Sequence, residues 1–384
     1  MSGSKYIEIP IGPQHPALHE PILFRVKVEG EKIVDVIPST GYNHRGIERL
    51  CEDNTFLRDV FLAGRVCGIC NVIHTTCYSE CIERVGNIDV PPRAKYLRTI
   101  LNELERIHSH MLLFAILGEL IGFQTLFMLV MRDRESILTL KELIAGNRIQ
   151  ADYVMPGGVR KDLTPEKIQQ IKKALDQVRA RIKYYKKVFE NDSIIKKRLS
   201  GVGILDVQDV YRYGFVGPIA RASGVKSDVR CEDYYAAYND IPFNVITRNE
   251  CDSWSRMMVR VDELFESVNI VEYAVDHLPE GPIGPKAMIR TVKAGEAIAR
   301  VEAPRGELVY YIISKGGDKP YRVKIRTPSF NNILNCQVMF KDANLADLPA
   351  ILVSLDPCIS CMERLVVVEE NGRAEMKSLV DLAR

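Results

Sequence analysis

The amino-acid sequence predicts an α+β protein that is mainly α-helical. Three observations lead to this prediction: strand-like alternation in residues 5–40, long helical repeats of apolar residues in the middle of the chain, and a strand-rich stretch over residues 285–345. No repeat, low-complexity segment or linker interrupts the chain. We therefore expect one compact body with three regions: a β-hairpin region at 1–40, a mostly helical region at 41–290 and a β-rich region at 291–364.

The N-terminal region has the pattern of a β-hairpin. Apolar and polar side chains alternate over residues 6–10, 23–28 and 33–37. Glu29-Gly30-Glu31-Lys32 lies between the last two segments and contains the glycine that a tight turn favours. We expect residues 23–37 to form two antiparallel strands.

Several segments of the helical region repeat apolar residues every three or four positions. Residues 45–85 should be helical around a pair of cysteines, and Pro91-Pro92 ends that part. A long helix is expected from about Arg93. A second begins at Thr164-Pro165-Glu166, where a cap, a first-turn proline and an acid occur together, and a third covers residues 252–277.

The stretch Met111–Met131 requires a separate test because it is mostly apolar and long enough to span a bilayer. It contains Glu119 and Gln124, and the charged run Arg132-Asp133-Arg134-Glu135 follows directly. We therefore expect a buried helix of the protein core rather than a membrane span.

Composition limits the classes of function. The chain has 384 residues and a formal net charge of +2, so its overall charge indicates no nucleic-acid partner. It contains ten cysteines, and its first residues lack the basic and apolar pattern of a secretory leader. We expect a reducing compartment, in which cysteines bind metals rather than form disulfides.

Two Cys-x-x-Cys pairs lie far apart, Cys67 with Cys70 and Cys358 with Cys361. Two residues between cysteines let both sulfurs turn to the same side, so two pairs can form a four-thiolate site. Such a site suits zinc, an iron–sulfur cluster or nickel. A structural zinc site usually has its pairs about 15–20 residues apart. The separation here favours a redox metal site, although structural zinc and unrelated thiols remain alternatives.

The residues around these pairs resemble a known family. Arg65-x-Cys67-Gly68-x-Cys70-x-x-x-His74 and Asp356-Pro357-Cys358-x-x-Cys361-x-x-Arg364 resemble the first and last cysteine motifs of the [NiFe]-hydrogenase large subunit. Glu302-Ala303-Pro304-Arg305-Gly306 resembles its arginine loop. The resemblance covers nearly the whole chain and is closest to the energy-converting, membrane-associated branch, which is related to the quinone-site subunit of complex I. It implies the hydrogenase large-subunit fold with a central helix bundle.

The resemblance also implies a ligand set. Cys67 and Cys358 would bind nickel alone, while Cys70 and Cys361 would bridge nickel to iron. The family carries CO and CN ligands on this iron. No further iron–sulfur motif is visible, so no iron–sulfur cluster is expected in this chain.

Other residues of the three motifs receive expected roles around the metals. His74 would place a ring N–H against a bridging sulfur, and the Pro304 turn would direct Arg305 to the open metal position. Asp356 would orient Arg305 or the cysteine turn. Glu20 matches the family's proton-relay glutamate and would need burial near the thiolates. The alternatives are a core histidine, a surface arginine and exposed turn acids.

Two expectations concern the last part of the chain. Glu48 matches a magnesium position in many relatives, but Arg364 stands where those relatives have a histidine, so an Arg–Glu pair is the alternative. Many precursors of the family carry an extension that an endopeptidase removes after nickel insertion. The extension here would be residues 365–384, with cleavage after Arg364; a permanent tail is the alternative.

The expected function is that of a hydrogenase catalytic subunit that interconverts H2 with protons and electrons. The expected partners are a small subunit with a [4Fe–4S] cluster, ferredoxin and the other subunits of a membrane complex on the cytoplasmic side of the cell membrane. One alternative is a metal-free, complex I-like quinone-site subunit, and another is a zinc-stapled scaffold. A related branch that reduces sulfur compounds departs from the four-cysteine set, which is complete here.

Overall fold

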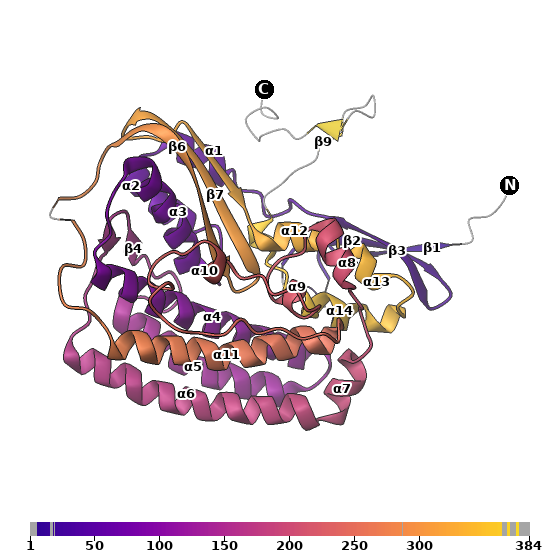
Figure 1. The fold of residues 1–384 in the computed structure, drawn as a ribbon. Helices are drawn as coiled ribbons and strands as arrows, with labels where there is room; N and C mark the ends of the chain where they lie inside the picture. The colour runs from indigo at the N-terminus through magenta and orange to yellow at the C-terminus, as the bar shows by residue number, and fades with distance from the viewer. Residues whose placement is uncertain are drawn as a thin grey trace.

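The computed structural model describes residues 6–15, 18, 20–285 and 287–362, together with the backbone of two short strands, β9 (Val367–Val368) and β10 (Ala374–Glu375). Four long helices form the largest layer of the molecule (Figure 1). They are α4 (Pro92–Leu120), α5 (Gln124–Ala145), α6 (Pro165–Asn191) and α11 (Ser253–Asp276). Helix α4 packs against α5 and α11, and α6 packs against α5 and α11. The prediction of a mainly helical protein with a central bundle is confirmed.

The ends of α6 and α11 follow from local sequence. Thr164 accepts a hydrogen bond from the backbone N–H of Lys167, and Pro165 occupies the first turn of α6. Asp252 and Ser255 form a reciprocal capping box at the start of α11. The buried residues of α6 recur on one face, which is the stripe that the sequence indicates: Ile171, Leu175, Val178, Ile182, Tyr185 and Phe189.

The apolar stretch Met111–Met131 is not one helix, and this corrects the sequence prediction. Helix α4 ends at Leu120, and α5 begins at Gln124 and folds back along α4 (Figure 1). Gly122 has φ of 80°, a left-handed conformation that glycine adopts without steric cost and that ends the helix. Among the described residues, no helix combines the length and apolar character that crossing a bilayer requires.

An antiparallel sheet at the N-terminus has the order β1 (Ile7–Ile11), β2 (Leu23–Glu29) and β3 (Lys32–Ser39). The predicted hairpin is confirmed, and β1 adds a third strand through pairing of Ile7 with Val28. The buried side chains of β2 and β3 join a separate apolar cluster with the short helices α8 (Val207–Tyr213), α9 (Pro218–Arg221), α12 (Pro328–Leu334), α13 (Gln337–Phe340) and α14 (Leu348–Ser354).

A second sheet consists of β6 (Val292–Ala303), β7 (Gly306–Gly317) and β8 (Arg322–Arg326), all antiparallel. Helix α3 (Asn71–Gly86) packs on it, α2 (Phe56–Gly64) lies beside α3, and α1 (Ile47–Asp53) packs against α2 and β8 (Figure 1). Ala303 pairs with Gly306, so Pro304 and Arg305 form a two-residue turn at the end of the hairpin. This turn points toward the helix bundle.

Strands were expected up to residue 345, but the last of them ends at Arg326. Pro328 follows at the first position of α12, and short helices occupy most of residues 328–354. Short elements also connect the larger ones elsewhere: β4 (Val154–Met155), β5 (Gly158–Val159), α7 (Ser193–Leu199) and α10 (Val229–Glu232).

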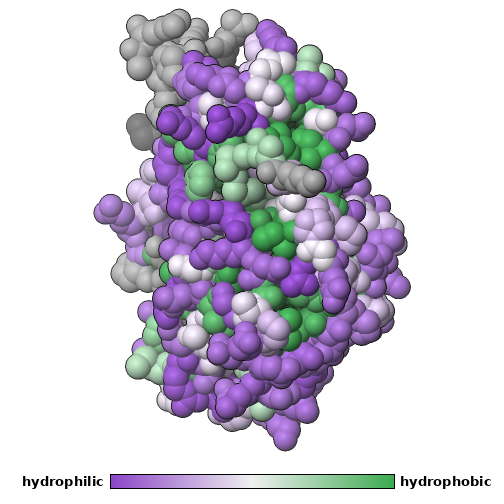
Figure 2. All heavy atoms as spheres, turned by 90° about the vertical axis from the view of Figure 1, so that its left-hand side faces the viewer, coloured by the Kyte–Doolittle hydropathy of each residue, from purple (hydrophilic) through white to green (hydrophobic). Residues whose placement is uncertain are grey.

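Apolar and hydrophilic side chains both reach the face that lies to the left in Figure 1 (Figure 2). A surface groove of about 620 Å³ lies where α2, the β4–β5 hairpin and the loop after α11 meet. Its apolar lining includes Leu57, Met155, Pro282, Ile283 and Met288.

Candidate metal centre

The four thiols of the two Cys-x-x-Cys pairs lie together in the interior. Cys67 and Cys70 occupy the loop between α2 and α3, and Cys358 and Cys361 follow α14. The sulfur of Cys67 lies 3.2 Å from that of Cys358, and the sulfur of Cys70 lies 4.0 Å from that of Cys361. None of the four residues is more than 7% exposed. The fold therefore brings the two ends of the chain to one buried site.

The spacing of the sulfurs fits metal binding. Metal–thiolate bonds of about 2.3 Å in a tetrahedral arrangement place sulfurs roughly 3.7 Å apart. The observed 3.2 and 4.0 Å lie on either side of that value, and the sulfurs of Cys67, Cys70 and Cys361 all lie within 4.8 Å of one another. Such a set fits nickel, iron or zinc.

The surroundings of Cys67 stabilise its thiolate form. Its sulfur accepts hydrogen bonds from the backbone N–H groups of Ile69 and Cys70, at 3.2 and 3.3 Å. Hydrogen bonds from the neighbouring thiols, chiefly from Cys358, hold the pKa of Cys67 well below its usual range. A thiolate is the form that binds a metal.

Arg45 holds the two cysteine motifs together, and our sequence analysis did not single it out. Its guanidinium donates to the carbonyl oxygens of Arg65 (2.8 Å) and Val66 (2.9 Å), just before the first pair. It also donates to the carbonyl oxygen of Ser360 (2.9 Å), within the last pair. A rigid fork of donors suits this bridging role.

Arg305 lies beside the sulfurs and is fixed by three contacts. It donates to the carbonyl oxygen of Asp356 (2.8 Å), to the carboxylate of Asp356 (2.7 Å) and to the hydroxyl of Ser109 on α4 (3.1 Å). The ion pair with Asp356 and the nearby cysteines raise the pKa of Arg305 against the effect of burial, so it remains charged. Gly217 packs directly on this turn, where a Cβ would lie 2.4 Å from the Cα of Gly306.

His74 contacts the centre from α3. Its Nε2 lies 3.8 Å from the sulfur of Cys361, and its Nδ1 lies 2.8 Å from the hydroxyl of Tyr310. Burial lowers the pKa of His74 to about 4 and raises that of Tyr310, so both side chains are neutral near pH 7. If the Tyr310 hydroxyl donates to Nδ1, the ring proton is on Nε2 and faces the sulfur.

Glu20 reaches the centre from the N-terminal region. Its carboxylate accepts hydrogen bonds from the backbone N–H groups of Ile359 (2.8 Å) and Ser360 (3.2 Å) and from the Ser360 hydroxyl. Both partners lie between Cys358 and Cys361. The structure therefore places this carboxylate next to the last cysteine pair, on the N-terminal side of the centre.

A cavity of about 550 Å³ opens beside these residues. Polar groups of Glu20, Arg305 and Asp356 contribute to its lining, and apolar residues from α4, α5 and α14 form most of the rest: Leu112, Leu113, Ile116, Leu120, Phe127, Met131, Leu352 and Val353. A largely apolar cavity with a few polar groups at one place is typical of a small-molecule site.

Glu48 lies in the first turn of α1, and its side chain reaches β8. Its carboxylate pairs with Lys324 (3.1 Å) and accepts a hydrogen bond from the backbone N–H of Ile325 (2.9 Å). Arg364, the expected alternative partner and the expected cleavage position, lies outside the described residues. The magnesium site and the cleavage remain predictions.

Comparison with known proteins identifies the family. Residues 121–293 and 285–364 match the model of the 49 kDa subunit of respiratory-chain NADH dehydrogenase, and residues 45–121 match that of nickel-dependent hydrogenase. The carbon monoxide-induced hydrogenase of Rhodospirillum rubrum is 40% identical over 93% of this chain and 99% of its own length. The chain belongs to the [NiFe]-hydrogenase large-subunit family, in the branch shared with complex I.

Other members of the [NiFe]-hydrogenase large-subunit family are similarly close. The membrane-bound hydrogenase subunit alpha of Pyrococcus furiosus is 37% identical over 98% of this chain and 92% of its own length. A chain in the structure of the membrane-bound sulfane sulfur reductase, an archaeal respiratory membrane complex, has a TM-score of 0.90 and 32% identity over 95% of this chain and 100% of that chain. The predicted fold is confirmed, and the family includes oxidoreductases of different activities.

Sequence reasoning missed three contacts of the centre. Arg45 lies outside the three motifs on which the predicted site was based. Ser109 and Tyr310 carried no signal, because a serine on a long helix and a tyrosine on a strand are common. Their roles depend on contacts between residues distant in sequence.

Proposed function

We propose that this chain is the catalytic subunit of a membrane-associated, energy-converting [NiFe] hydrogenase that interconverts H2 with protons and electrons. The observation that carries the proposal is the convergence of four buried thiols from two distant motifs. The carbon monoxide-induced hydrogenase and the membrane-bound hydrogenase among the relatives support it.

Cys67 and Cys358 would hold nickel, and Cys70 and Cys361 would hold nickel together with an iron that carries CO and CN. When bound, this pair of metals supplies an open coordination position at which H2 is polarised. Arg305 would hold a fixed positive charge beside the metals, because its contacts with Asp356 and Ser109 keep the guanidinium from turning away from the thiols. With the Tyr310 hydroxyl donating to Nδ1, His74 would direct its Nε2–H to the sulfur of Cys361.

Glu20 serves as the proton acceptor next to the centre. Its carboxylate is held by Ile359 and Ser360, so it lies close to the thiolates while remaining half-buried. Proton transfer through a positioned carboxylate contributes about 10²–10⁴-fold to a rate. Because Glu20 and Arg305 both line the apolar cavity, H2 and the proton route would meet at the same place.

The partners follow from the same proposal. Electrons would pass to or from a small subunit with a [4Fe–4S] cluster, with ferredoxin as the soluble carrier, and further subunits would attach the protein to the cytoplasmic side of the membrane and couple turnover to ion movement. Relatives named as membrane-bound support membrane attachment through partners. The expected body at residues 1–364, the removal of residues 365–384 by an endopeptidase and the magnesium at Glu48 belong to this proposal.

Isotope exchange tests the proposal without the natural electron carrier. The purified complex, incubated with D2 in ordinary water, should release HD, because splitting D2 and exchanging the deuteron with water needs no net electron transfer. The variant Cys67→Ser should abolish HD release, whereas Cys231→Ser, at an exposed cysteine, should not. A nickel-loaded complex that releases no HD would contradict the proposal.

A second candidate is a quinone-site subunit, and the 550 Å³ cavity favours it. Its volume lies within the roughly 300–1,000 Å³ range of small-molecule pockets, and its apolar walls suit a quinone. The match to the 49 kDa subunit of NADH dehydrogenase also supports this candidate. A quinone that protects Leu112 or Met131 from a photoreactive analogue, in a complex that releases no HD, would favour it over the hydrogenase.

A further inference from the structure

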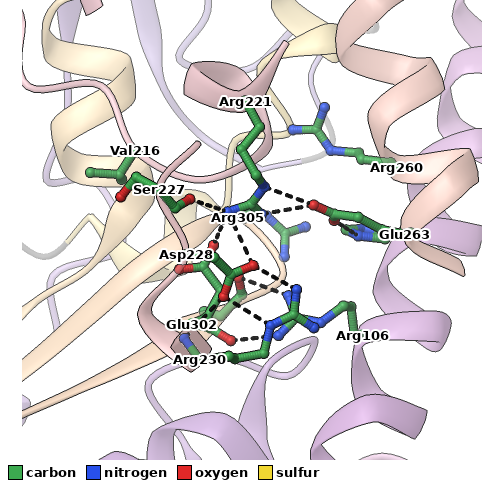
Figure 3. Close-up of polar contacts among 12 residues, drawn as sticks. Arg106, Val216, Arg221, Ser227, Asp228, Arg230, Arg260, Glu263, Glu302 and Arg305 are labelled. Atoms are coloured by element: carbon green, nitrogen blue, oxygen red, sulfur yellow. Dashed lines mark hydrogen bonds and ion pairs between the residues drawn. The ribbon is translucent and has the colours of Figure 1, made fainter. Parts of the chain in front are cut away.

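A cluster of buried charges lies beside the Arg305 turn. Figure 3 shows the guanidinium of Arg221 between the carboxylate of Glu263 on one side and those of Asp228 and Glu302 on the other. All charged side chains of the cluster are at most 2% exposed, and they are Arg106, Arg221, Arg230, Glu103, Asp228, Glu263 and Glu302. None of them has a role in the proposed reaction.

The charges of this cluster do not balance when all its groups are ionised. Three arginines face four carboxylates. His110 contacts Glu263, but burial lowers the pKa of His110, so near neutral pH it supplies no positive charge. Arg260 faces the carboxylates of Asp356, at 3.9 Å, and Glu263, and no ion pair joins it to Glu302. An unbalanced buried carboxylate is costly unless it binds a proton.

The hydrogen bonds indicate which carboxylate binds it. Glu103 accepts from Arg106, Arg230, Tyr238 and Ser267, and Asp228 accepts three N–H groups of Arg230. Glu263 accepts from Arg221 and His110.

Glu302 has the weakest set of donors. It accepts one short bond from Arg221, at 2.7 Å, and a long one from the backbone N–H of Val229, at 3.3 Å. Burial raises the pKa of Glu302 to about 7; Arg221 opposes the rise and the negative charge of Asp228 adds to it.

We propose that Glu302 is a buried proton-binding site, which exchanges one proton with solvent near neutral pH and binds it more tightly when the thiol centre gains an electron. The second part rests on the proposed function. In this step one electron from a one-electron reductant enters the centre, one proton from solvent forms an O–H bond on the Glu302 carboxylate, and no other bond changes. The proton then compensates the added negative charge.

Only a few residues and contacts connect Glu302 to the thiol centre. Glu302 and Ala303 offer their carbonyl oxygens to Arg106, at 2.7 and 3.2 Å, and the Arg305 turn follows immediately. Arg305 in turn pairs with Asp356, two residues before Cys358. The ionisable groups facing Glu302 come from α4, α9, α10 with its N-cap, α11 and the loop after α10: Glu103, Arg106, Arg221, Asp228, Arg230, Tyr235 and Glu263.

Infrared spectroscopy of the protonated carboxylic acid tests, in the metal-free chain, whether Glu302 binds a proton near neutral pH. Protein labelled with ¹³C at the glutamate carboxyl groups should show a labelled acid band that grows as the pH falls through about 7, shifts in D2O and is lost in Glu302→Gln. Asp59→Asn is the matched control, because Asp59 is a buried acid without an arginine partner and its band does not carry the glutamate label. The label restricts the band to glutamates, and Glu105→Gln separates Glu302 from Glu105, a buried glutamate whose pKa is also raised by burial. A labelled spectrum without such a band between about pH 6 and 8 would overturn the proposal.

The response of Glu302 to reduction of the centre is tested in the metal-loaded complex. The difference between dithionite-reduced and oxidised spectra should contain a growing Glu302 acid band, absent in Glu302→Gln. An acid band that is present in the metal-free chain but does not respond to reduction would overturn the redox link and leave the proton site intact. Loss of HD release with an intact band would instead count against the proposed hydrogenase function alone.

Discussion

Arg305 and Asp356 form a buried ion pair of 2.7 Å that joins the β6–β7 turn to the last cysteine motif. In the sequence, 50 residues (306–355) separate Arg305 from Asp356, and Cys358 follows Asp356 by two positions. Asp356 has φ of 53°, so its backbone is bent into the left-handed region at the point where the pair forms. The pair therefore positions both the guanidinium and the cysteine loop.

Replacing Arg305 with lysine should disable the centre more than it unfolds the protein. A lysine keeps the charge but can make only part of the contacts with Asp356 and Ser109. We expect HD release to fall by about 100-fold or more, as for loss of a positioned donor. Arg84→Lys, at a half-exposed pair with Asp233, is the control and should change it little. An unchanged rate in Arg305→Lys would exclude a geometric role for the guanidinium.

Replacing Glu20 with glutamine should slow proton transfer while the metals stay bound. The glutamine oxygen can still accept from Ile359 or Ser360, but the amide cannot take up a proton. HD release should fall by about 10²–10⁴-fold with unchanged nickel content. Glu8→Gln, on the exposed strand β1, should behave like the wild type. If Glu20→Gln exchanged at the full rate, the proton would have to leave by another residue.

Replacing Tyr310 with phenylalanine should alter the electronic environment of Cys361 through His74. Loss of the hydroxyl leaves Nδ1 of a buried histidine without its donor, at a cost of about 1–3 kcal/mol, and no longer fixes the ring proton on Nε2. We expect the infrared bands of the iron ligands to shift at constant nickel content. The adjacent Tyr311→Phe removes an exposed hydroxyl bound to Glu296 and should leave the bands in place. Identical spectra for the two variants would argue against this contact.

Asp59 should make stability depend on pH. Burial raises the pKa of Asp59 from 3.8 to about 8, and the Tyr78 hydroxyl donates a hydrogen bond to one oxygen of this carboxylate. The folded state thus keeps a proton that the unfolded state releases above about pH 4, so the stability contributed by Asp59 falls as the pH rises from about 4 to 8 and is constant above that. Asp59→Asn should remove this slope.

Relative to the wild type, Asp59→Asn should gain up to about 4 kcal/mol between pH 5 and pH 8, since the window covers about three pH units and each unit corresponds to about 1.4 kcal/mol. Urea unfolding of the metal-free chain at both pH values measures the gain. Parallel stability curves for the two proteins would mean that Asp59 is ionised in the folded state.

The parts of the fold that sequence reasoning found are those with local causes. The cap at Thr164 and the box at Asp252 mark helix starts without reference to the rest of the chain, and the hairpin over 23–37 has its turn between its own strands. The break near Gly122 was missed because apolar residues continue through it, and hydrophobicity alone does not distinguish one helix from two that fold back.

The candidate site could be predicted only in part. Cysteine spacing and flanking motifs identified the thiols, Arg305 and His74, because the residue types are rare and the spacing is regular. Long-range contacts such as those of Arg45 and Ser109 left no pattern. The charged residues of α4, including Glu103 and Arg106, received no role from the sequence, yet they are fully buried, because their partners come from α10, α11 and β6.

The central claim is that the four thiols hold nickel and iron, and metal analysis with infrared spectroscopy of the purified complex tests it most directly. The account predicts nickel and iron in nearly equal amounts within this chain, with CO and CN stretching bands that disappear in Cys67→Ser and persist in Cys231→Ser. Zinc alone, or no metal and no such bands, in a fully matured complex would contradict it.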